Sequence, residues 1–97
     1  MDTDKKTYAS IITELKSLAM SLTDHPNEEQ LRRFMDLENL ADRHECEEDI
    51  RKGLTLIPIE IDEWLRFRIA RRARSLGKTT NEYIITLLIK CLKANFV

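Results

Sequence analysis

The chain has 97 residues and a formal net charge of −1, a length that suits one domain with a modest hydrophobic core. Hydrophobic residues make up 42% and charged residues 34%, with only two Gly and two Pro, which is typical of folded, mostly helical proteins and excludes broad disorder. No apolar run approaches the roughly 18 residues of a membrane span, and the polar N-terminus does not resemble a signal peptide. We therefore expect a cytoplasmic protein with no membrane partner.

The charge is divided unevenly along the chain. Residues 1–52 hold 8 Lys/Arg and 13 Asp/Glu, a net charge of −5, whereas residues 53–97 hold 8 Lys/Arg and 4 Asp/Glu, a net charge of +4. Such a division favours two parts with different partners. We expect an acidic helical region over residues 1–52 and a basic domain over residues 53–97.

The sequence carries no pattern of a metal, cofactor or catalytic site. His44 and Cys46 are two residues apart, so on a helix they point in different directions, and no second pair of ligands follows. Cys46 and Cys91 are expected to be reduced thiols on different helices. No nucleophile has a neighbouring base and no glycine-rich phosphate loop is present, which indicates a protein that is not an enzyme and needs no cofactor.

Two amphipathic helices are predicted in the acidic region. Apolar residues recur every three or four positions from Asp4 to about Leu22, the spacing of a helix with one apolar face. Pro26 interrupts this helix, and Asn27 is a suitable N-cap for the next one. The apolar stripe of that second helix weakens in the charged stretch after Ala41, so we expect it to end or break near residues 42–46.

A short strand is predicted after Gly53. Ile57, Ile59 and Ile61 alternate with other residues, as on one face of a strand of about five to seven residues. A lone strand in a helical chain needs a partner for its backbone groups, and the same strand in a second copy is the simplest one. The pattern therefore predicts pairing across a two-fold axis.

Two further helices follow the expected strand. Asp62 can cap a helix over residues 63–76, and Gly77 suits the left-handed position after its end. Thr79 or Thr80 can cap a fourth helix that continues close to the C-terminus. The order of elements is then strand, helix, glycine turn and helix.

With this order, residues 54–93 resemble the ribbon-helix-helix (MetJ/Arc-type) superfamily of DNA-binding proteins. The segment "IPIEIDEWLRFRIARRARSLGKTTNEYI" is similar to the strand, first helix, turn and second helix of that family. The resemblance implies a mostly α fold, a ribbon-helix-helix homodimer with one strand per chain, preceded by two or three amphipathic helices. It also implies a dimer core formed by Ile57, Ile59, Ile61, Leu65, Ile69, Ile84 and Leu88.

The same resemblance implies two sets of DNA-contacting residues. The outward side chains of the ribbon would face base edges in the major groove, and here these are Leu56, Pro58 and Glu60. None of them is basic, and two copies of Glu60 would repel phosphate. The first helix and the start of the second would contact phosphates through Arg68, Arg71, Arg74, Lys78, Thr79, Thr80 and Asn81.

Two functions are compatible with these features. The first is a dimeric DNA-binding regulator or repressor that inserts its ribbon into duplex DNA, as in plasmid, phage or conjugation control. The alternative is a protein–protein interaction module, antitoxin-like or adaptor-like, that keeps the scaffold for dimerisation with weak or no DNA binding. Trp64 and Phe67 lie outside the family's inward positions and need a cover, which the N-terminal helices can provide. A protein partner and a higher oligomer are therefore also expected.

Overall fold

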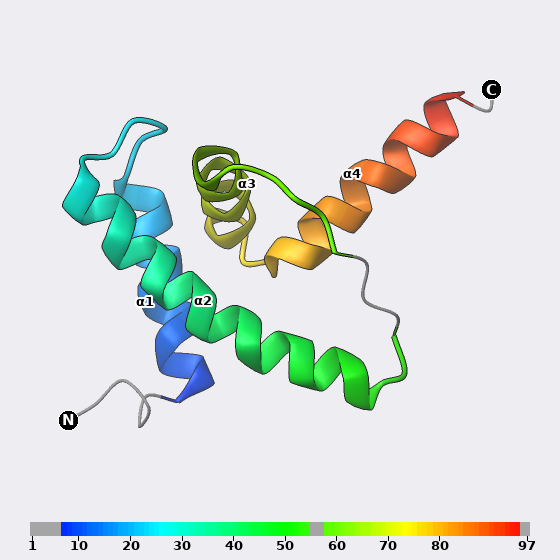
Figure 1. Cartoon of the computed structure of the whole chain (residues 1–97), viewed down its shortest axis with the longest axis horizontal. Coiled ribbons are helices and arrows are strands. Elements are labelled where there is room, and N and C mark those ends of the chain that lie inside the picture. Colours follow the sequence, from blue (N-terminus) through cyan, green and yellow to red (C-terminus); the bar gives the residue numbers. More distant parts are fainter. Residues whose placement is uncertain (1–6, 55–57, 96–97) are drawn as a thin grey trace.

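The described part of the chain is formed by four helices. The computed structural model describes residues 7–54 and 58–95, and within them lie α1 (Tyr8–Ser21), α2 (Glu28–Arg51), α3 (Glu63–Ser75) and α4 (Thr80–Asn95). The first three helices pack together, and α4 extends away from them after a short turn (Figure 1). Neither Cys46 nor Cys91 forms a disulfide. No helix in these two ranges combines the length and the apolar character needed to cross a membrane.

The structure overturns the predicted ribbon. The described residues contain no strand, and residues 58–62, which connect α2 to α3, are exposed and belong to no regular element. Leu56 and Ile57 lie outside the described residues. A ribbon-helix-helix protein requires a strand, so both the resemblance to that superfamily and the fold derived from it are wrong. Alternating isoleucines favour an extended backbone, but a strand also needs a neighbouring strand, which the described helical chain does not offer.

The starts of the helices follow the sequence closely. The side chain of Asn27 accepts a hydrogen bond from the backbone N–H of Gln30 at 2.8 Å, and the Gln30 side chain accepts one from the Asn27 N–H at 2.9 Å. This reciprocal capping box fixes the start of α2 at the predicted residue. Asp62 caps α3 as predicted, accepting from the N–H of Leu65 at 2.8 Å.

The turn between α3 and α4 also has the predicted chemistry. Gly77 has a φ of +74°, the left-handed conformation that glycine adopts without strain. Thr79 and Glu82 then form a second capping box: the Thr79 hydroxyl accepts from the Glu82 N–H, and the Glu82 carboxylate accepts from the Thr79 N–H. The two boxes start α2 and α4 at defined residues.

The predicted end of α2 is wrong. The helix continues through residues 42–46 to Arg51 and is 24 residues long. Glu and Arg, which make up five of the ten residues from Asp42 to Arg51, have helix propensities close to that of Ala, so a weaker apolar stripe does not end the helix. Gly53, with a φ of +80°, follows the true end.

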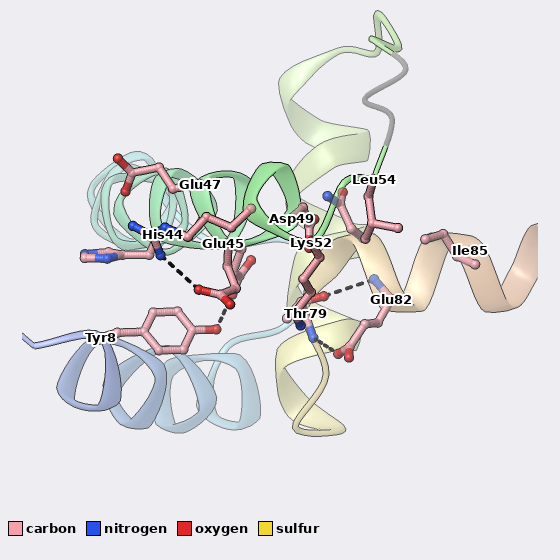
Figure 2. A pocket seen from close by; sticks show the side chains of 13 residues that line it. Tyr8, His44, Glu45, Glu47, Asp49, Lys52, Leu54, Thr79, Glu82 and Ile85 are labelled. Carbon is pink, nitrogen blue, oxygen red and sulfur yellow. Dashed lines mark hydrogen bonds and ion pairs between the residues drawn. The ribbon is translucent and has the colours of Figure 1, made fainter.

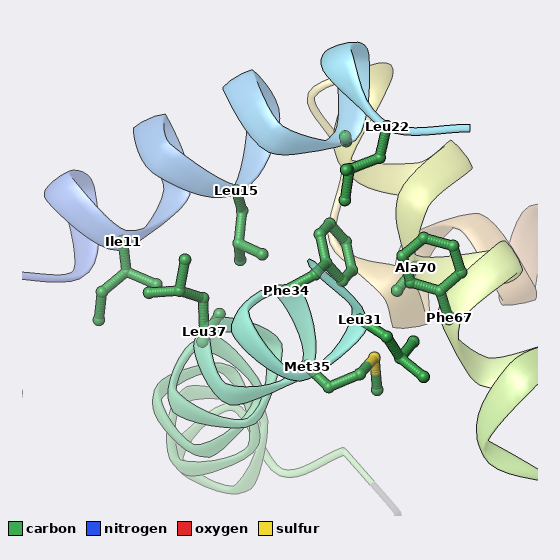
Figure 3. Packing of buried hydrophobic residues seen from close by; sticks show 11 residues of the cluster. Ile11, Leu15, Leu22, Leu31, Phe34, Met35, Leu37, Phe67 and Ala70 are labelled. Atoms are coloured by element: carbon green, nitrogen blue, oxygen red, sulfur yellow. The ribbon is translucent and has the colours of Figure 1, made fainter. Parts of the chain in front are cut away.

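The hydrophobic core lies between α1, α2 and α3. Its centre is an edge-to-face pair of Phe34 and Phe67, with ring centroids 5.2 Å apart and planes at 81° (Figure 3). Ile11 and Leu15 of α1 join the same buried cluster. Phe67 is thus covered by the N-terminal helices, as expected, whereas Trp64 stays 44% exposed. One core extends across the predicted boundary between residues 52 and 53.

Helix α3 faces the core with a different side from the one that the resemblance implies. Phe67, Ala70, Ala73 and Arg74 are buried, whereas Leu65 is exposed. The buried side of α3 is the one that packs on α1 and α2 within the chain. Of the two α3 residues that the resemblance placed in the dimer core, Leu65 is exposed and Ile69 is half-buried.

Candidate functional site

A buried ionic cluster joins α2, α3 and α4. The Arg74 side chain is 2% exposed and donates hydrogen bonds to Glu38 at 2.9 Å and to both carboxylate oxygens of Glu45, at 2.8 and 3.1 Å. Burial opposes the charged form, but the hydrogen bonds to Glu45 and Glu38 outweigh it, so the pKa of Arg74 is raised. A guanidinium saturated in this way has no donors left in solvent for a phosphate.

The cluster also includes residues from the first and last helices. The Thr80 hydroxyl, at the start of α4, donates to Glu38 at 2.7 Å, and the Tyr8 hydroxyl of α1 donates to Glu45 at 2.6 Å. Burial, followed by the hydrogen bond to Glu45 and the negative charge of that carboxylate, raises the pKa of Tyr8 to about 12. All four helices therefore meet at one set of hydrogen bonds.

Arg71 is used inside the molecule as well. It donates to the carbonyl oxygens of Ala19 and Leu22 at the end of α1, at 3.4 and 3.2 Å, and forms an ion pair with Asp24. The hydrogen bond from Arg71 is the main cause that lowers the pKa of the Asp24 carboxyl. Helix α1 has no basic residue in its own last turn, so Arg71 supplies the positive charge that its C-terminus favours.

The residues expected to contact phosphates are thus separated into two groups. Arg71, Arg74 and Thr80 are engaged in contacts between helices, and Thr79 caps α4. The side chains that remain in solvent are those of Arg68 and Lys78, with Asn81 half-buried.

The residues expected in the ribbon and in the dimer core are mostly at the surface. Pro58 and Glu60 are exposed on the segment that precedes α3. Six residues expected in the dimer core are described. Four of them are exposed, Ile59, Ile61, Leu65 and Leu88, and two are half-buried, Ile69 and Ile84. These residues do not form a core within one chain.

Large apolar side chains are exposed along α4 from Ile85 to Leu92. Every side chain from Leu87 to Ala94 is exposed. These residues belong to α4, a 16-residue helix that leads away from the other three (Figure 1). One stripe with three- and four-residue spacing lies along the exposed length of the helix. We call it the α4 stripe, and its residues are Ile85, Leu88, Ile89 and Leu92.

An open cleft of about 510 Å³ lies between α2 and the start of α4 (Figure 2). Five carboxylates and two cations line its walls: Glu45, Glu47, Glu48, Asp49 and Glu82, with Arg51 and Lys52. The excess of negative charge makes this cleft unfavourable for a phosphate backbone. Ile85 also lines the cleft, so the α4 stripe begins at its edge.

Comparison of the chain with protein-family models, with curated proteins and with solved structures gave no match. The functional interpretation therefore depends on the geometry of the described residues alone.

The buried cluster was not expected from the sequence, although a signal for it exists. Glu38 and Glu45 are seven residues apart, about two helical turns, and Glu38 lies at the spacing of Leu31 and Phe34 in the apolar stripe of α2. A carboxylate within an apolar stripe indicates a buried cationic partner. The stripe thus predicts a buried cation beside Glu38, but the spacing does not say which arginine or lysine of the chain supplies it.

Proposed function

We propose that this protein is an interaction module in which α1, α2 and α3 form a folded body that holds α4 out as a docking helix. The observation that carries the proposal is the exposure of every side chain from Leu87 to Ala94 on a helix rich in Leu and Ile. Apolar surface gathered on one element is typical of a binding site rather than of ordinary solvent-facing residues.

The energetics of α4 support this proposal. Fully burying a Leu or Ile side chain contributes about 1.5 to 3 kcal/mol, so covering one that is half exposed contributes about 1 kcal/mol. Leu88 is 53% exposed, and the other residues of the α4 stripe are similarly accessible. An isolated helix of about 15 residues is only marginally stable in water, so α4 gains both burial and helical order from a partner.

Site-specific photo-crosslinking in cells tests the proposal. A photoreactive amino acid in place of Leu88 should give a crosslinked protein product. The same replacement of Met20, which is 69% exposed on α1, is the matched control and should give little. Absence of any product from position 88, with the chain folded and expressed, would contradict a docking role for α4.

Binding to duplex DNA is the second candidate. It is favoured by the exposed positive charge of Arg68 and Lys78, and of Arg72, which forms an ion pair with Asp24 at 3.8 Å but whose side chain is 61% exposed. Without the ribbon this charge supports phosphate contacts but no reading of bases. The internal use of Arg71 and Arg74 reduces the number of phosphate contacts, so we expect weak binding that depends steeply on salt.

Fluorescence anisotropy with duplex DNA across a salt series tests this candidate. If DNA is a partner, Arg68→Ala and Lys78→Ala should weaken binding to all sequences alike, because neither residue is placed to read bases. A flat response at low salt would exclude DNA and leave the docking role of α4 untouched.

A further inference from the structure

The α4 stripe has the spacing of a helix that pairs with another helix. Ile85, Leu88 and Leu92 are separated by three and then four residues, which is the spacing of the buried seam in paired helices, and Ile89 widens the same face. At about 3.6 residues per turn, the four side chains lie on one face of the helix. That face is about as wide as the face that a helix buries against one partner. One helix-shaped partner therefore fits the stripe.

The charges beside the stripe indicate what that partner carries. Glu82 and Lys93 are eleven residues apart, about three turns, so they lie on the same flank of the stripe at opposite ends of α4. The Glu82 carboxylate also accepts the Thr79 N–H, and a complementary helix is favoured if it presents a positive charge beside Glu82 and a negative charge beside Lys93. A second α4 in the antiparallel direction presents both.

The symmetry of helix pairs selects the antiparallel direction. In an antiparallel pair related by a two-fold axis, the same flanks of the two helices face each other, so each Glu82 approaches the Lys93 of the other copy. If Ile85 of one copy packs opposite Leu92 of the other, Glu82 of one copy and Lys93 of the other lie nearly opposite each other. In a parallel pair the charged flank would instead face the opposite flank, which carries Ile84 and Cys91 and offers no charge.

We infer that the occupant of the α4 stripe is a second copy of this chain, with the two α4 helices packed antiparallel around a two-fold axis near Leu88. The inference rests on the docking role proposed for α4 and names its partner. Antiparallel packing also aligns the two helix dipoles favourably.

Sedimentation velocity of the full chain, from micromolar to submillimolar concentration, tests the inference. The mass should rise from one copy to two with concentration. Leu88→Glu places two carboxylates opposite each other at the axis and should raise the dissociation constant about 100-fold or more. Met20→Glu makes the same change of charge at another exposed apolar residue and should leave the dimer intact. Far-ultraviolet circular dichroism verifies that both variants fold.

Disulfide trapping tests the direction of packing. In a background with Cys46→Ser and Cys91→Ser, Ile85→Cys and Leu92→Cys are introduced into separate chains. An antiparallel pair brings position 85 of one copy close to position 92 of the other, so a mixture of the two variants should form a disulfide while each alone forms little. Efficient bridging by each variant alone would show parallel packing and overturn the inference.

The possible failures are distinguishable. A chain that is monomeric over the whole range, or a dimer that Leu88→Glu leaves intact, overturns the second copy as occupant. If position 88 nevertheless crosslinks to a different protein in cells, the docking role of α4 stands and only its partner changes. If position 88 crosslinks to nothing, both the inference and the proposed function fail.

Discussion

Arg74 is the residue on which the junction of the helices depends. It is buried with the carboxylates of Glu38 and Glu45. Glu38 also accepts a hydrogen bond from Thr80 of α4, and Glu45 accepts one from Tyr8 of α1. Removing a partner from a buried ion pair costs more than the pair contributes, because the remaining charge is left unpaired in the interior. The guanidinium is therefore a structural group in this protein.

Replacement of Arg74 should be strongly destabilising. Arg74→Met retains much of the apolar volume but leaves Glu38 and Glu45 without their cation, so we expect the free energy of unfolding to fall by about 3 to 5 kcal/mol. Urea denaturation followed by circular dichroism measures the loss. Arg72→Ala on the exposed side of α3 is the control and should change stability by less than about 0.5 kcal/mol.

Tyr8 predicts a dependence of stability on alkaline pH. Its pKa is raised from 10.0 to about 12, so its contribution is fully present below pH 10 and is lost as the pH rises through about 12. In this window the unfolded chain releases the tyrosine proton and the folded chain keeps it. Ultraviolet titration of tyrosinate in a Tyr83→Phe background should show the raised midpoint. Ionisation at an ordinary pH near 10 would contradict the hydrogen bond to Glu45.

At the scale of single elements, local chemistry determines where helices begin. Asn27, Asp62 and Gly77 were identifiable as caps because each acts through a few neighbouring residues. The end of α2 and the state of the segment before α3 were not, because they depend on tertiary contacts. Residues 58–61 alternate like a strand, but the described chain supplies no strand to pair with them.

The capping box of α2 gives a test at this scale. Asn27→Ala removes the acceptor for the Gln30 N–H and should lower the free energy of unfolding by about 1 kcal/mol. Asn27→Asp keeps an acceptor at the same place and should retain most of the stability. Thermal unfolding of the two variants, compared with the native chain, measures the difference. Equal losses for both would show that the side-chain hydrogen bond does not contribute.

For the whole molecule, one core connects parts that the charge pattern separates. The sequence predicts an acidic region over residues 1–52 and a basic domain over residues 53–97, yet Phe67 and Ala70 are buried in the same cluster as Ile11 and Phe34. The candidate site shows the same limit of sequence reasoning. Arg71 and Arg74 suggested a phosphate-binding face because their distant partners, Asp24 and Glu38, could not be inferred from local spacing.

A chain of residues 58–97 alone should therefore not fold. It would lose the packing of Phe67 on Phe34 and leave Arg74 without its buried carboxylates. We expect low helicity and no cooperative thermal transition by circular dichroism, in contrast to the full chain. A sharp, reversible transition in the fragment would show that the C-terminal part folds independently of the N-terminal helices.

The hydrogen bond from Thr80 to Glu38 attaches the start of α4 to α2. At about 1.5 Å per residue this helix is about 24 Å long, and the α4 stripe lies along the part that leads away from the body. Inserting one residue before the α4 stripe would rotate the stripe by about 100° about the helix axis. The position and the orientation of any protein bound to the α4 stripe therefore depend on the number of residues between Thr80 and Leu88.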